Sequence, residues 1–444
     1  MTDETITVDH GGWLREVPDT WRVGPLRRFC SITLGKMVSQ IPAKDGELAR
    51  PYLRAAHVQP NGQLVLADIK LMAFTKDETT RLRLSRGDVV VVEGGAGFGR
   101  SAVLREDLDD WGFQNSINRV RPFDGEGRFL NYVLLAAQAS GHFETLINTA
   151  TIPHLTAEKL AEVQVAWPDF VLQNLIADFL DARAAKIDAL IEKQERLIET
   201  LAERRQAAVN HAVTKGLDPT APMKDSGFQA IGRIPSHWDV SPLRHVIRSV
   251  KSGTSVNALD VEPDDGEIGV LKTSCVSTGN FDVRQAKSVD PDELGRVACP
   301  VEANRLIVSR MNTPALVGAA GLTRHAAPRT FLPDRLWQVE FTHVEPEFVH
   351  SWTQTPAYRD QVSIVCVGTS SSMQNLSQSD FRSFLLPLPP LDEQLKICRF
   401  LKRETGQIDA LTVKAREMID VLKERRQALI NAAVTGKIDV RGLS

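Results

Sequence analysis

A glycine-rich octapeptide is the first part of the sequence that could do chemistry. Residues 94–101 read GGAGFGRS, one residue away from the GxxxxGK[ST] loop that holds nucleotide phosphates, because Arg100 stands where the lysine belongs. A guanidinium cannot reproduce the compact reach of that lysine. Acidic loop sequence, not a long helix, follows Ser101. We interpret the segment as a glycine-rich β-turn; the alternative is a P-loop-like nucleotide hydrolase.

The sequence motifs of other enzyme classes are missing. The sequence has no Asn/Asp-Pro-Pro-Tyr/Phe methyltransferase motif, no convincing S-adenosylmethionine loop and no Asp…Glu-x-Lys nuclease pattern. His57, His154 and His325 stand apart from any nucleophile–base pattern. The five cysteines are scattered, which argues for a reducing cytosol and against a structural zinc site; they are Cys30, Cys275, Cys299, Cys366 and Cys398. We therefore expect a chain that is not an enzyme, with no metal or cofactor of its own.

Composition sets further limits. The 444 residues predict about three domains, and 42% hydrophobic with 25% charged residues is typical of a globular protein. The polar N-terminus is unlike a signal peptide, and no apolar run has the length of a membrane span. We expect a cytoplasmic protein with no membrane contact. The net charge of −3 gives no general support to nucleic-acid binding, so such a surface must be local or completed by partners.

The same passage is written into the chain twice. Residues 187–214 match residues 408–435 at a shift of 221, and about 22 of the 51 positions in 168–218 are identical to 389–439. A second pair, VPDTWRVGPLRR at 17–28 and IPSHWDVSPLRH at 234–245, has a shift of 217. The chain thus alternates unlike domains with matching helical segments. A protein of this design reads two different things at a fixed separation.

The repeated segments predict two long helices that pack on each other as an antiparallel coiled coil with internal pseudo-twofold symmetry. Residues 171–213 contain no Gly or Pro, whereas Gly406 interrupts the copy and Asp392 is its expected N-cap. Apolar residues recur at heptad spacing, as Ile176, Leu180, Ile187, Leu190, Leu197 and Leu201, and in the copy as Ile397, Leu401, Ile408, Leu411, Met418 and Leu422. From these stripes we expect a helix-pair core of Ile187, Leu190, Leu201, Ile408, Leu411 and Leu422. Arg204 and Arg425 continue the stripes, so that end of each helix is solvated or faces a partner.

The inserts between the repeats look alike in class. GDVVVVEGG at 87–95 matches ANRLIVSRM at 303–311, and helical segments are expected at 129–140 and 346–358. The predicted fold class is α+β: two α+β domains with curved mixed sheets, separated by two long helices. The expected divisions are a first α+β domain (1–166), a central helical region (167–218), a linker with the second α+β domain (219–388) and a C-terminal helical region (389–444).

These residues resemble the specificity subunits of type I restriction–modification systems. The resemblance rests on LPPLDEQLKICRFLKRETGQIDAL, on ERRQALINAAVTGKIDV and on the repeated (V/I)P-x-x-W-x-V-x-PL, and it covers nearly the whole chain. The first copy departs from the pattern, with WPDFVLQN in place of LPPLDEQ and VTKG in place of VTGK. Its first helical turn is therefore expected to be capped differently.

The resemblance implies two target-recognition domains, each reading one half of a bipartite sequence in double-stranded DNA. It implies two adenine methyltransferase (modification) subunits that carry S-adenosylmethionine. It also implies that the complex can include two restriction subunits, motor nucleases that use ATP and Mg²⁺. Such a system acts in phage defence, in the cytoplasm at the nucleoid. A coiled-coil adaptor with two protein-binding domains and no DNA role is the alternative.

Candidate DNA contacts follow from strand ends and polar turns. We expect Arg54 and Lys272 at matching strand ends, and Arg100, Arg310 and Asn312 on matching turns. Arg119 alternates with Arg121 along a strand, and the loop at 369–374 could donate to phosphates. The expected DNA-binding residues are Arg54, Arg100, Arg119, Lys272, Arg310, Asn312, Ser370 and Gln374. For each of them, a solvated surface side chain is the alternative.

Overall fold

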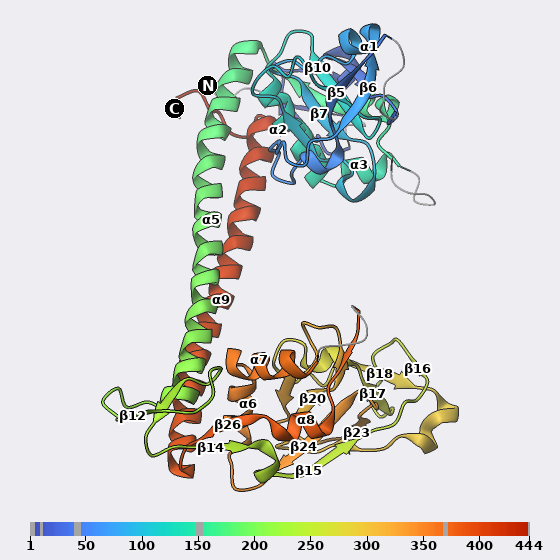
Figure 1. Cartoon of the computed structure of the whole chain (residues 1–444). Helices are drawn as coiled ribbons and strands as arrows, with labels where there is room; N and C mark the ends of the chain where they lie inside the picture. Colours follow the sequence, from blue (N-terminus) through green and yellow to red (C-terminus); the bar gives the residue numbers. More distant parts are fainter. Residues whose placement is uncertain (1–4, 9–11, 40–45, 148–153, 367–371, 443–444) are drawn as a thin grey trace. The chain divides into compact units, whose positions relative to one another are not determined.

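The computed structural model describes residues 5–8, 12–39, 46–147, 154–366 and 372–442. The chain divides into two compact units, Met1–Gln194 with Arg416–Ser444, and Glu195–Ala415. Two long helices, α5 (Phe170–Lys215) and α9 (Leu391–Val434), each contribute one part to each unit. Figure 1 shows them side by side. In the first unit the start of α5 accompanies the end of α9, so the two helices pack antiparallel.

The first unit is built around an antiparallel sheet. Its strand order is β4-β10-β7-β8, and the bounds are Cys30–Leu34, Ile117–Pro122, Val89–Val92 and Ser101–Val103. A mixed sheet adds the strands β6-β5-β9, at Leu71–Thr75, Glu47–Leu53 and Gly112–Phe113. Helix α2 (Gly127–Ala139) is buried along most of its length against the first sheet. The core also takes in Ile430, Ala433 and Val434 from the end of α9.

The second unit repeats this plan. Its antiparallel sheet has the order β15-β24-β20-β22, at Ile247–Ser252, Leu336–Phe341, Leu306–Ser309 and Ala320–Leu322. The mixed sheet has the order β16-β18-β17-β23-β19, at Ala258–Leu259, Ala286–Val289, Gly269–Leu271, Ala327–Phe331 and Pro300–Val301. The single helix expected at 346–358 is two helices, α6 (Pro346–Thr353) and α7 (Pro356–Val365), because Pro356 starts a new helix after a turn capped by Thr355.

The repeated entry signature has the same role in both units. In the first, β3 (Arg22–Pro25) pairs with β11 (Gln164–Trp167); in the second, β14 (Asp239–Pro242) pairs with β26 (Leu385–Leu388). The signature tryptophans, Trp21 and Trp238, are both buried. These pairs bring the beginning of each recognition domain to its end, just before the long helix starts.

The beginnings of the long helices use one shared and one divergent device. Gln173 and Gln394 are both buried, and each donates to the carbonyl of Pro168 or Pro389, at 2.9 and 2.8 Å respectively. The first turns differ: the carboxylate of Asp169 accepts from the Leu172 amide at 2.9 Å. In α9 the Pro390 carbonyl accepts from the amide nitrogens of residues 393 and 394. The different capping expected from WPDFVLQN is confirmed, whereas Asp392 lies inside α9 and is not its N-cap.

The buried face of the helices differs from the predicted stripe. Its buried and half-buried positions are Ile187, Ile191, Gln194, Ile198, Leu201 and Arg205 on α5, and Ile408, Thr412, Ala415, Ile419, Leu422 and Arg426 on α9. Four predicted core residues lie on this face, but Leu190 and Leu411 do not, since their exposed fractions are 46% and 50%. The heptad alternates steps of four and three, and the step after Ile187 and Ile408 is four. Helix α9 also continues without interruption through Gly406.

An equivalent ion pair joins the two helices once in each unit. Arg426 lies 3.1 Å from Asp188 in the first unit, and Arg205 lies 3.4 Å from Asp409 in the second. The shift of 221 residues relates each arginine to the other and each aspartate to the other. The duplication is therefore visible in the contacts as well as in the sequence, and the predicted fold class is confirmed.

Candidate nucleic-acid interface

The ends of strands β7 and β20 form an equivalent backbone site in the two units. The Glu93 amide donates to the Ser116 carbonyl at 2.9 Å, and the Glu93 carbonyl accepts from Leu155 at 2.7 Å. The Arg310 amide donates to the Arg335 carbonyl at 3.0 Å, and its carbonyl accepts from Leu376 at 2.8 Å. The same three segments of each fold therefore meet at this position.

This equivalence corrects the alignment made from sequence. The match of 87–95 with 303–311 sets Glu93 opposite Ser309, one residue out of register. In the structure Val92 pairs with Ile117 as Ser309 pairs with Leu336, so position 93 corresponds to position 310. Gly87 and Asn304, both with positive φ (89° and 54°), mark the same turn before the strands. Those turn residues are the sequence signal that could have set the register.

At a second equivalent position the two units carry side chains of opposite charge. Here the partner of each side chain also has the opposite charge in the other unit. In the first unit Asp88, only 1% exposed, lies 2.6 Å from Arg121. In the second unit Arg305 occupies the place of Asp88 and lies 3.1 Å from Glu340. The hydrogen bond to Asp88 raises the pKa of Arg121. Both partners have changed sign together, so this ion pair belongs to the framework of each domain.

Positions 93 and 310 also carry opposite charges, but no ion-pair partner changes sign with them. One oxygen of Glu93 and the Nε of Arg310 are buried without a hydrogen-bond partner, and neither side chain forms an ion pair within the described residues. Burial raises the pKa of the Glu93 carboxyl. Leaving buried polar atoms unsatisfied is costly, so a partner outside the chain is the natural complement of each side chain.

Three predicted contacts of the second unit meet at this site. Strand β21 (Met311–Asn312) pairs with β25 (Gln374–Asn375), which places Asn312 opposite Gln374. Asn312 donates to the Ser309 hydroxyl at 3.2 Å. Arg310, Asn312 and Gln374 thus lie together at the end of β20. Ser370, with its neighbours Thr369 and Ser371, lies outside the described residues.

In the first unit the glycine-rich turn follows the same strand. The turn η3 (Gly95–Gly97) leads through Arg100 into strand β8, which begins at Ser101. Ser101 is fully buried and its hydroxyl donates to Asn131 at 2.9 Å. A phosphate-binding loop needs a helix at this point and a hydroxyl free for the metal. The P-loop alternative is therefore wrong, and Arg100 lies half-buried beside the turn.

Arg54 and Lys272 occupy matching places, as expected. Arg54 follows the end of β5 and Lys272 follows the end of β17, each directly before a short 3-10 turn. Each is already paired: Arg54 with Asp68 at 2.9 Å and Lys272 with Asp260 at 2.7 Å. A DNA phosphate would have to compete with these exposed carboxylates for either cation.

Arg119 requires a correction. Its side chain is only 6% exposed, and its guanidinium donates to the Arg81 carbonyl at 3.1 Å and to the Thr33 hydroxyl at 3.1 Å. Burial lowers the pKa of Arg119. Strand alternation placed Arg119 on a side of β10 that packs into the domain, so its hydrogen bonds hold the fold together and do not face DNA.

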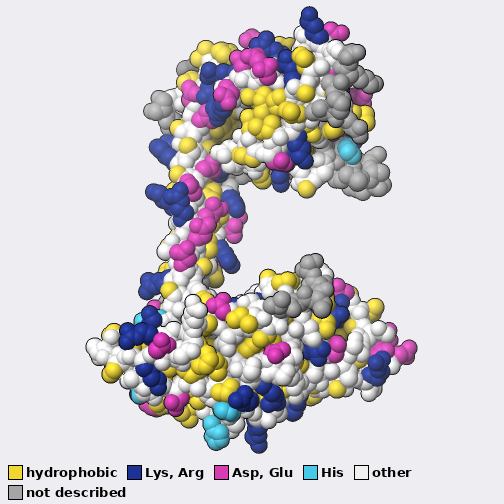
Figure 2. Space-filling model, in the orientation of Figure 1, with side chains coloured by type: hydrophobic (Ala, Val, Ile, Leu, Met, Phe, Trp, Pro, Cys, Tyr) yellow, Lys and Arg dark blue, Asp and Glu magenta, His cyan; other side chains and the backbone are white. Residues whose placement is uncertain are grey.

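The visible surface carries mixed charge. Figure 2 shows Lys and Arg side chains interspersed with Asp and Glu over both units and along the helices. This pattern agrees with the net charge of −3. Within the described residues no group of three His, Cys, Asp or Glu side chains has metal-site geometry, and none of the helices there combines the length and apolar character of a membrane span.

Comparison with known proteins agrees with this architecture. Residues 18–200 match the family model of the type I restriction modification DNA specificity domain. The chain is thus similar to the specificity subunits of type I restriction–modification systems. The resemblance seen in the sequence is confirmed by this match and by the relatives that follow.

Two relatives cover nearly the whole chain. It is 21% identical to the EcoKI specificity subunit of Escherichia coli K12, over 95% of this chain and 90% of the relative. It is 21% identical to the MjaVIII specificity subunit of Methanocaldococcus jannaschii, over 96% of this chain and 95% of the relative.

Solved structures share the fold. A chain from a study of complex assembly and conformational transition in a type I R-M system aligns with a TM-score of 0.71 and 15% identity, covering 95% of this chain and 99% of that one. The HsdS subunit from Thermoanaerobacter tengcongensis aligns with a TM-score of 0.51 and 16% identity, covering 95% and 98%.

Proposed function

We propose that each recognition domain reads one half of a bipartite DNA sequence, while the long helices set the spacer between the halves. The helices also recruit two adenine methyltransferase subunits and, in a restricting complex, two motor-nuclease subunits. S-adenosylmethionine, ATP and Mg²⁺ belong to those partners, and the chain supplies the DNA sequence preference. The recognition domains are those at 1–166 and 219–388, with helical regions at 167–218 and 389–444.

The observation that carries the two-reader proposal is the uncompensated exchange of charge at positions 93 and 310. The backbone there is held by the same hydrogen bonds, so evolution has varied the side chain on a constant frame. The exchange at Asp88 and Arg305, by contrast, is matched by a change of partner within the chain. A side chain that differs between the units, and that has no hydrogen-bond or ion-pair partner among the described residues of either unit, has the property required of a sequence reader.

The chemistry of the two side chains suggests what each would read. A guanidinium donates two hydrogen bonds to O6 and N7 of guanine, which makes Arg310 suited to a G·C pair. A carboxylate accepts from the N4 amino group of cytosine, which makes Glu93 suited to a cytosine. Arg100, Asn312, Gln374 and Ser370 are proposed to position the DNA through phosphate or base-edge contacts. Arg54 and Lys272 join them only when they exchange a carboxylate for a phosphate.

The helices have the length needed to set a spacer. Helix α5 has 46 residues and α9 has 44, and at 1.5 Å per residue each spans roughly 65–70 Å. Half-sites read from one face of a duplex lie about 34–36 Å apart or at a multiple of that distance. The methyltransferase would flip its target adenine out of the stack, and the specificity subunit would decide which adenine is presented.

A methyladenine map of the native genome, with and without this gene, tests the proposal. The expected result is a split motif of two short half-sites around a fixed spacer that disappears when the gene is deleted. A continuous motif would contradict the two-reader model. If the purified chain with its methyltransferase partner showed no DNA sequence preference, the adaptor without a DNA role would replace it.

A further inference from the structure

A pair of cations lies at the end of one strand in each unit. In the first unit the pair is Arg54, directly after β5, and Lys70, directly before β6. In the second unit it is Lys272, directly after β17, and Lys287 within β18. In both sheets the residue two before the first cation lies opposite the second cation. The two cation pairs therefore occupy equivalent places.

One aspartate lies against each cation pair. Asp68 lies 2.9 Å from Arg54. Asp260 lies 2.7 Å from Lys272 and 3.5 Å from Lys287. The hydrogen bond from the nearest cation, and then the charges of both cations, lower the pKa of each aspartate. Each cation pair therefore favours an anion beside it.

The two aspartates come from different parts of the fold. Asp68 lies in the chain after Arg54, whereas Asp260 lies before Lys272, directly after β16. The strand pairing that relates the two sheets sets Gln285 at the position of Asp68. The same arrangement is thus built in two ways. What the two units share is a carboxylate on the cation pair, not one duplicated residue.

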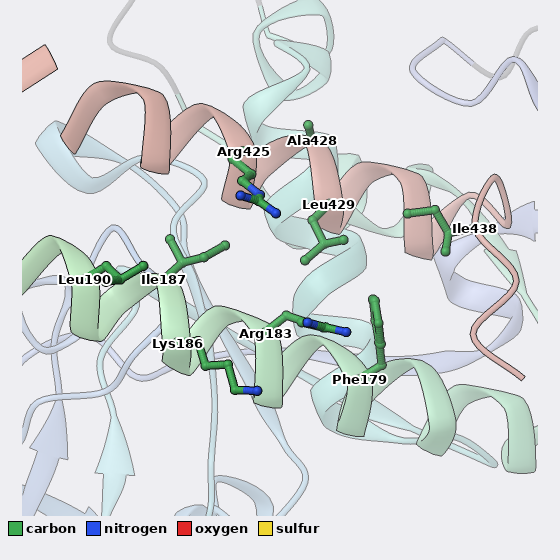
Figure 3. A pocket seen from close by; sticks show the side chains of 9 residues that line it. All are labelled: Phe179, Arg183, Lys186, Ile187, Leu190, Arg425, Ala428, Leu429 and Ile438. Atoms are coloured by element: carbon green, nitrogen blue, oxygen red, sulfur yellow. The ribbon is translucent and has the colours of Figure 1, made fainter. Parts of the chain in front are cut away.

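Not every exposed cation has such a partner. Figure 3 shows Arg183, Lys186 and Arg425 along the groove between α5 and α9, and none of the three forms an ion pair within the described residues. An ion pair with an exposed carboxylate contributes little to stability. Stability therefore does not account for an aspartate on the cation pair in both recognition domains.

The cations are held by the fold, whereas the carboxylates are exposed. The exposed fractions are 16% for Arg54 and 31% for Lys272, against 74% for Asp68 and 69% for Asp260. Arg54 also donates to the Asp68 carbonyl at 2.6 Å, and its Nε is buried without a hydrogen-bond partner. An incoming anion can therefore replace the carboxylate while the cation stays in place.

A short segment connects each cation pair to the reading position of the same unit. In the first unit residues 113–116 pair with the end of β5 and accept from the Glu93 amide at 2.9 Å. In the second unit residues 331–335 pair with β17 and accept from the Arg310 amide at 3.0 Å. The cation pair and the reading position therefore lie on the same edge of each domain.

We propose that each cation pair is a binding site for one backbone phosphate of DNA, and that its aspartate occupies the site until DNA displaces it. This inference rests on the proposed reading of DNA at positions 93 and 310. The aspartate acts as an internal phosphate mimic that cancels one of the two positive charges. A phosphate contact carries no sequence information, so the aspartates lower the affinity for every DNA sequence by the same factor. Stable binding then depends more on the base contacts.

The experiment removes the competing carboxylates. Asp68→Asn and Asp260→Asn are made in the full chain. The affinity of its complex with the methyltransferase subunit is then measured for cognate and unrelated duplexes over a range of salt concentrations. Each variant is expected to bind all duplexes about two- to fivefold more tightly at low salt, as expected for one exposed ion pair. The slope of log affinity against log salt concentration should steepen by up to about 0.9.

The gain should depend on the cation and on one phosphate. In an Arg54→Gln background, Asp68→Asn should lose most of its effect, because the two side chains act as a pair. Duplexes in which single phosphates are replaced by neutral methylphosphonates locate the site. One such replacement should abolish the gain of Asp68→Asn, and another, in the other half-site, the gain of Asp260→Asn.

Asp124→Asn is the matched control. It removes an exposed carboxylate of the first domain beyond the opposite end of β10, roughly 20 Å from residue 116, and should leave the affinity unchanged. Thermal unfolding followed by circular dichroism checks that every variant is folded. Unchanged affinity in both aspartate variants, or a gain that survives Arg54→Gln or every methylphosphonate, would overturn this inference and leave the reading of DNA standing. An unaltered complex without any sequence preference would overturn the proposed reading itself.

Discussion

Exchanging Glu93 and Arg310 separately for glutamine tests whether these positions read bases. Glutamine keeps the size of Glu93 and is two heavy atoms smaller than Arg310; in both cases it removes the charge and presents an amide donor and a carbonyl acceptor. That pair matches N6 and N7 of adenine. We therefore expect Glu93→Gln to move one position of one half-site from cytosine toward adenine. Arg310→Gln should move one position of the other half-site from guanine toward adenine.

The expected size of the change follows from the unpaired state of both side chains. A good bidentate base contact discriminates against the wrong base by about 1–3 kcal/mol. This corresponds to a change in relative affinity of about 5- to 150-fold. Since neither Glu93 nor Arg310 has a partner within the described residues, no internal hydrogen bond has to break for this energy to be gained.

The assay is competitive binding of the chain with its methyltransferase to duplexes that carry every single-base change in both half-sites. Glu158→Gln and Arg329→Gln are controls, because both residues are exposed side chains of the same two domains. The reasoning is refuted if the glutamine variants lower affinity equally for all duplexes, as loss of a phosphate contact would. It is refuted as well if one variant alters positions in both half-sites.

Four further outcomes are expected. Asp88→Asn should lower the free energy of unfolding by about 1.5–3 kcal/mol in urea titrations, because it removes the charge-assisted hydrogen bond between the buried Asp88 and Arg121, whose side chain is 39% exposed and stays partly solvated; a loss below about 0.5 kcal/mol would show that the pair is not structural. Gly99→Ala should cost about 1–3 kcal/mol, since φ is +73° and the new Cβ would meet Phe143 at 2.7 Å, whereas Gly95→Ala at φ +79° has open space and isolates the backbone strain. Deleting four residues from each long helix, about 6 Å, should change the tolerated spacer, and an unchanged spacer in the methylation map would reject the helical ruler. Because burial raises the pKa of Glu93, wild-type stability should fall as pH rises through that pKa, so Glu93→Gln should be relatively more stable at neutral than at acidic pH; parallel stability profiles would contradict the assigned burial of this carboxyl.

Much of the fold could be predicted from the sequence, because the same pattern occurs in both copies of the duplication. The long helices, the α+β class and the matching strand ends of Arg54 and Lys272 follow from periodicity and from repeated turns. The buried face between the two helices could not be predicted from the sequence. Leucines lie on both sides of the heptad position, and hydrophobicity alone cannot choose between Leu190 and Ile191. Ile191 lies on the buried face of α5, whereas Leu190 is exposed.

The candidate site was less accessible, because its residues are defined by partners that sequence does not display. Arg119 and Arg121 alternate on one strand and look equivalent in the sequence. In the structure Arg119 is buried and donates to a backbone carbonyl, whereas Arg121 forms an ion pair with Asp88. Glu93 was missed because an acidic residue is not an obvious DNA contact and because the strand match was one residue out of register. A shift of one residue turns every side chain of a strand to the opposite face.

Positions of opposite charge in the two units distinguish residues that hold the fold from residues that recognise a partner. They do so more clearly than conservation of residue type could. Where Asp88 and Arg121 become Arg305 and Glu340, the sign of each charge is irrelevant to the fold as long as the pair survives. Where Glu93 becomes Arg310, the change alters what the surface can bind, because neither side chain has an ion-pair partner among the described residues. A duplicated protein thus carries its own control: equivalent positions share a backbone, so a difference in unpaired charge between them is a difference in what each half recognises.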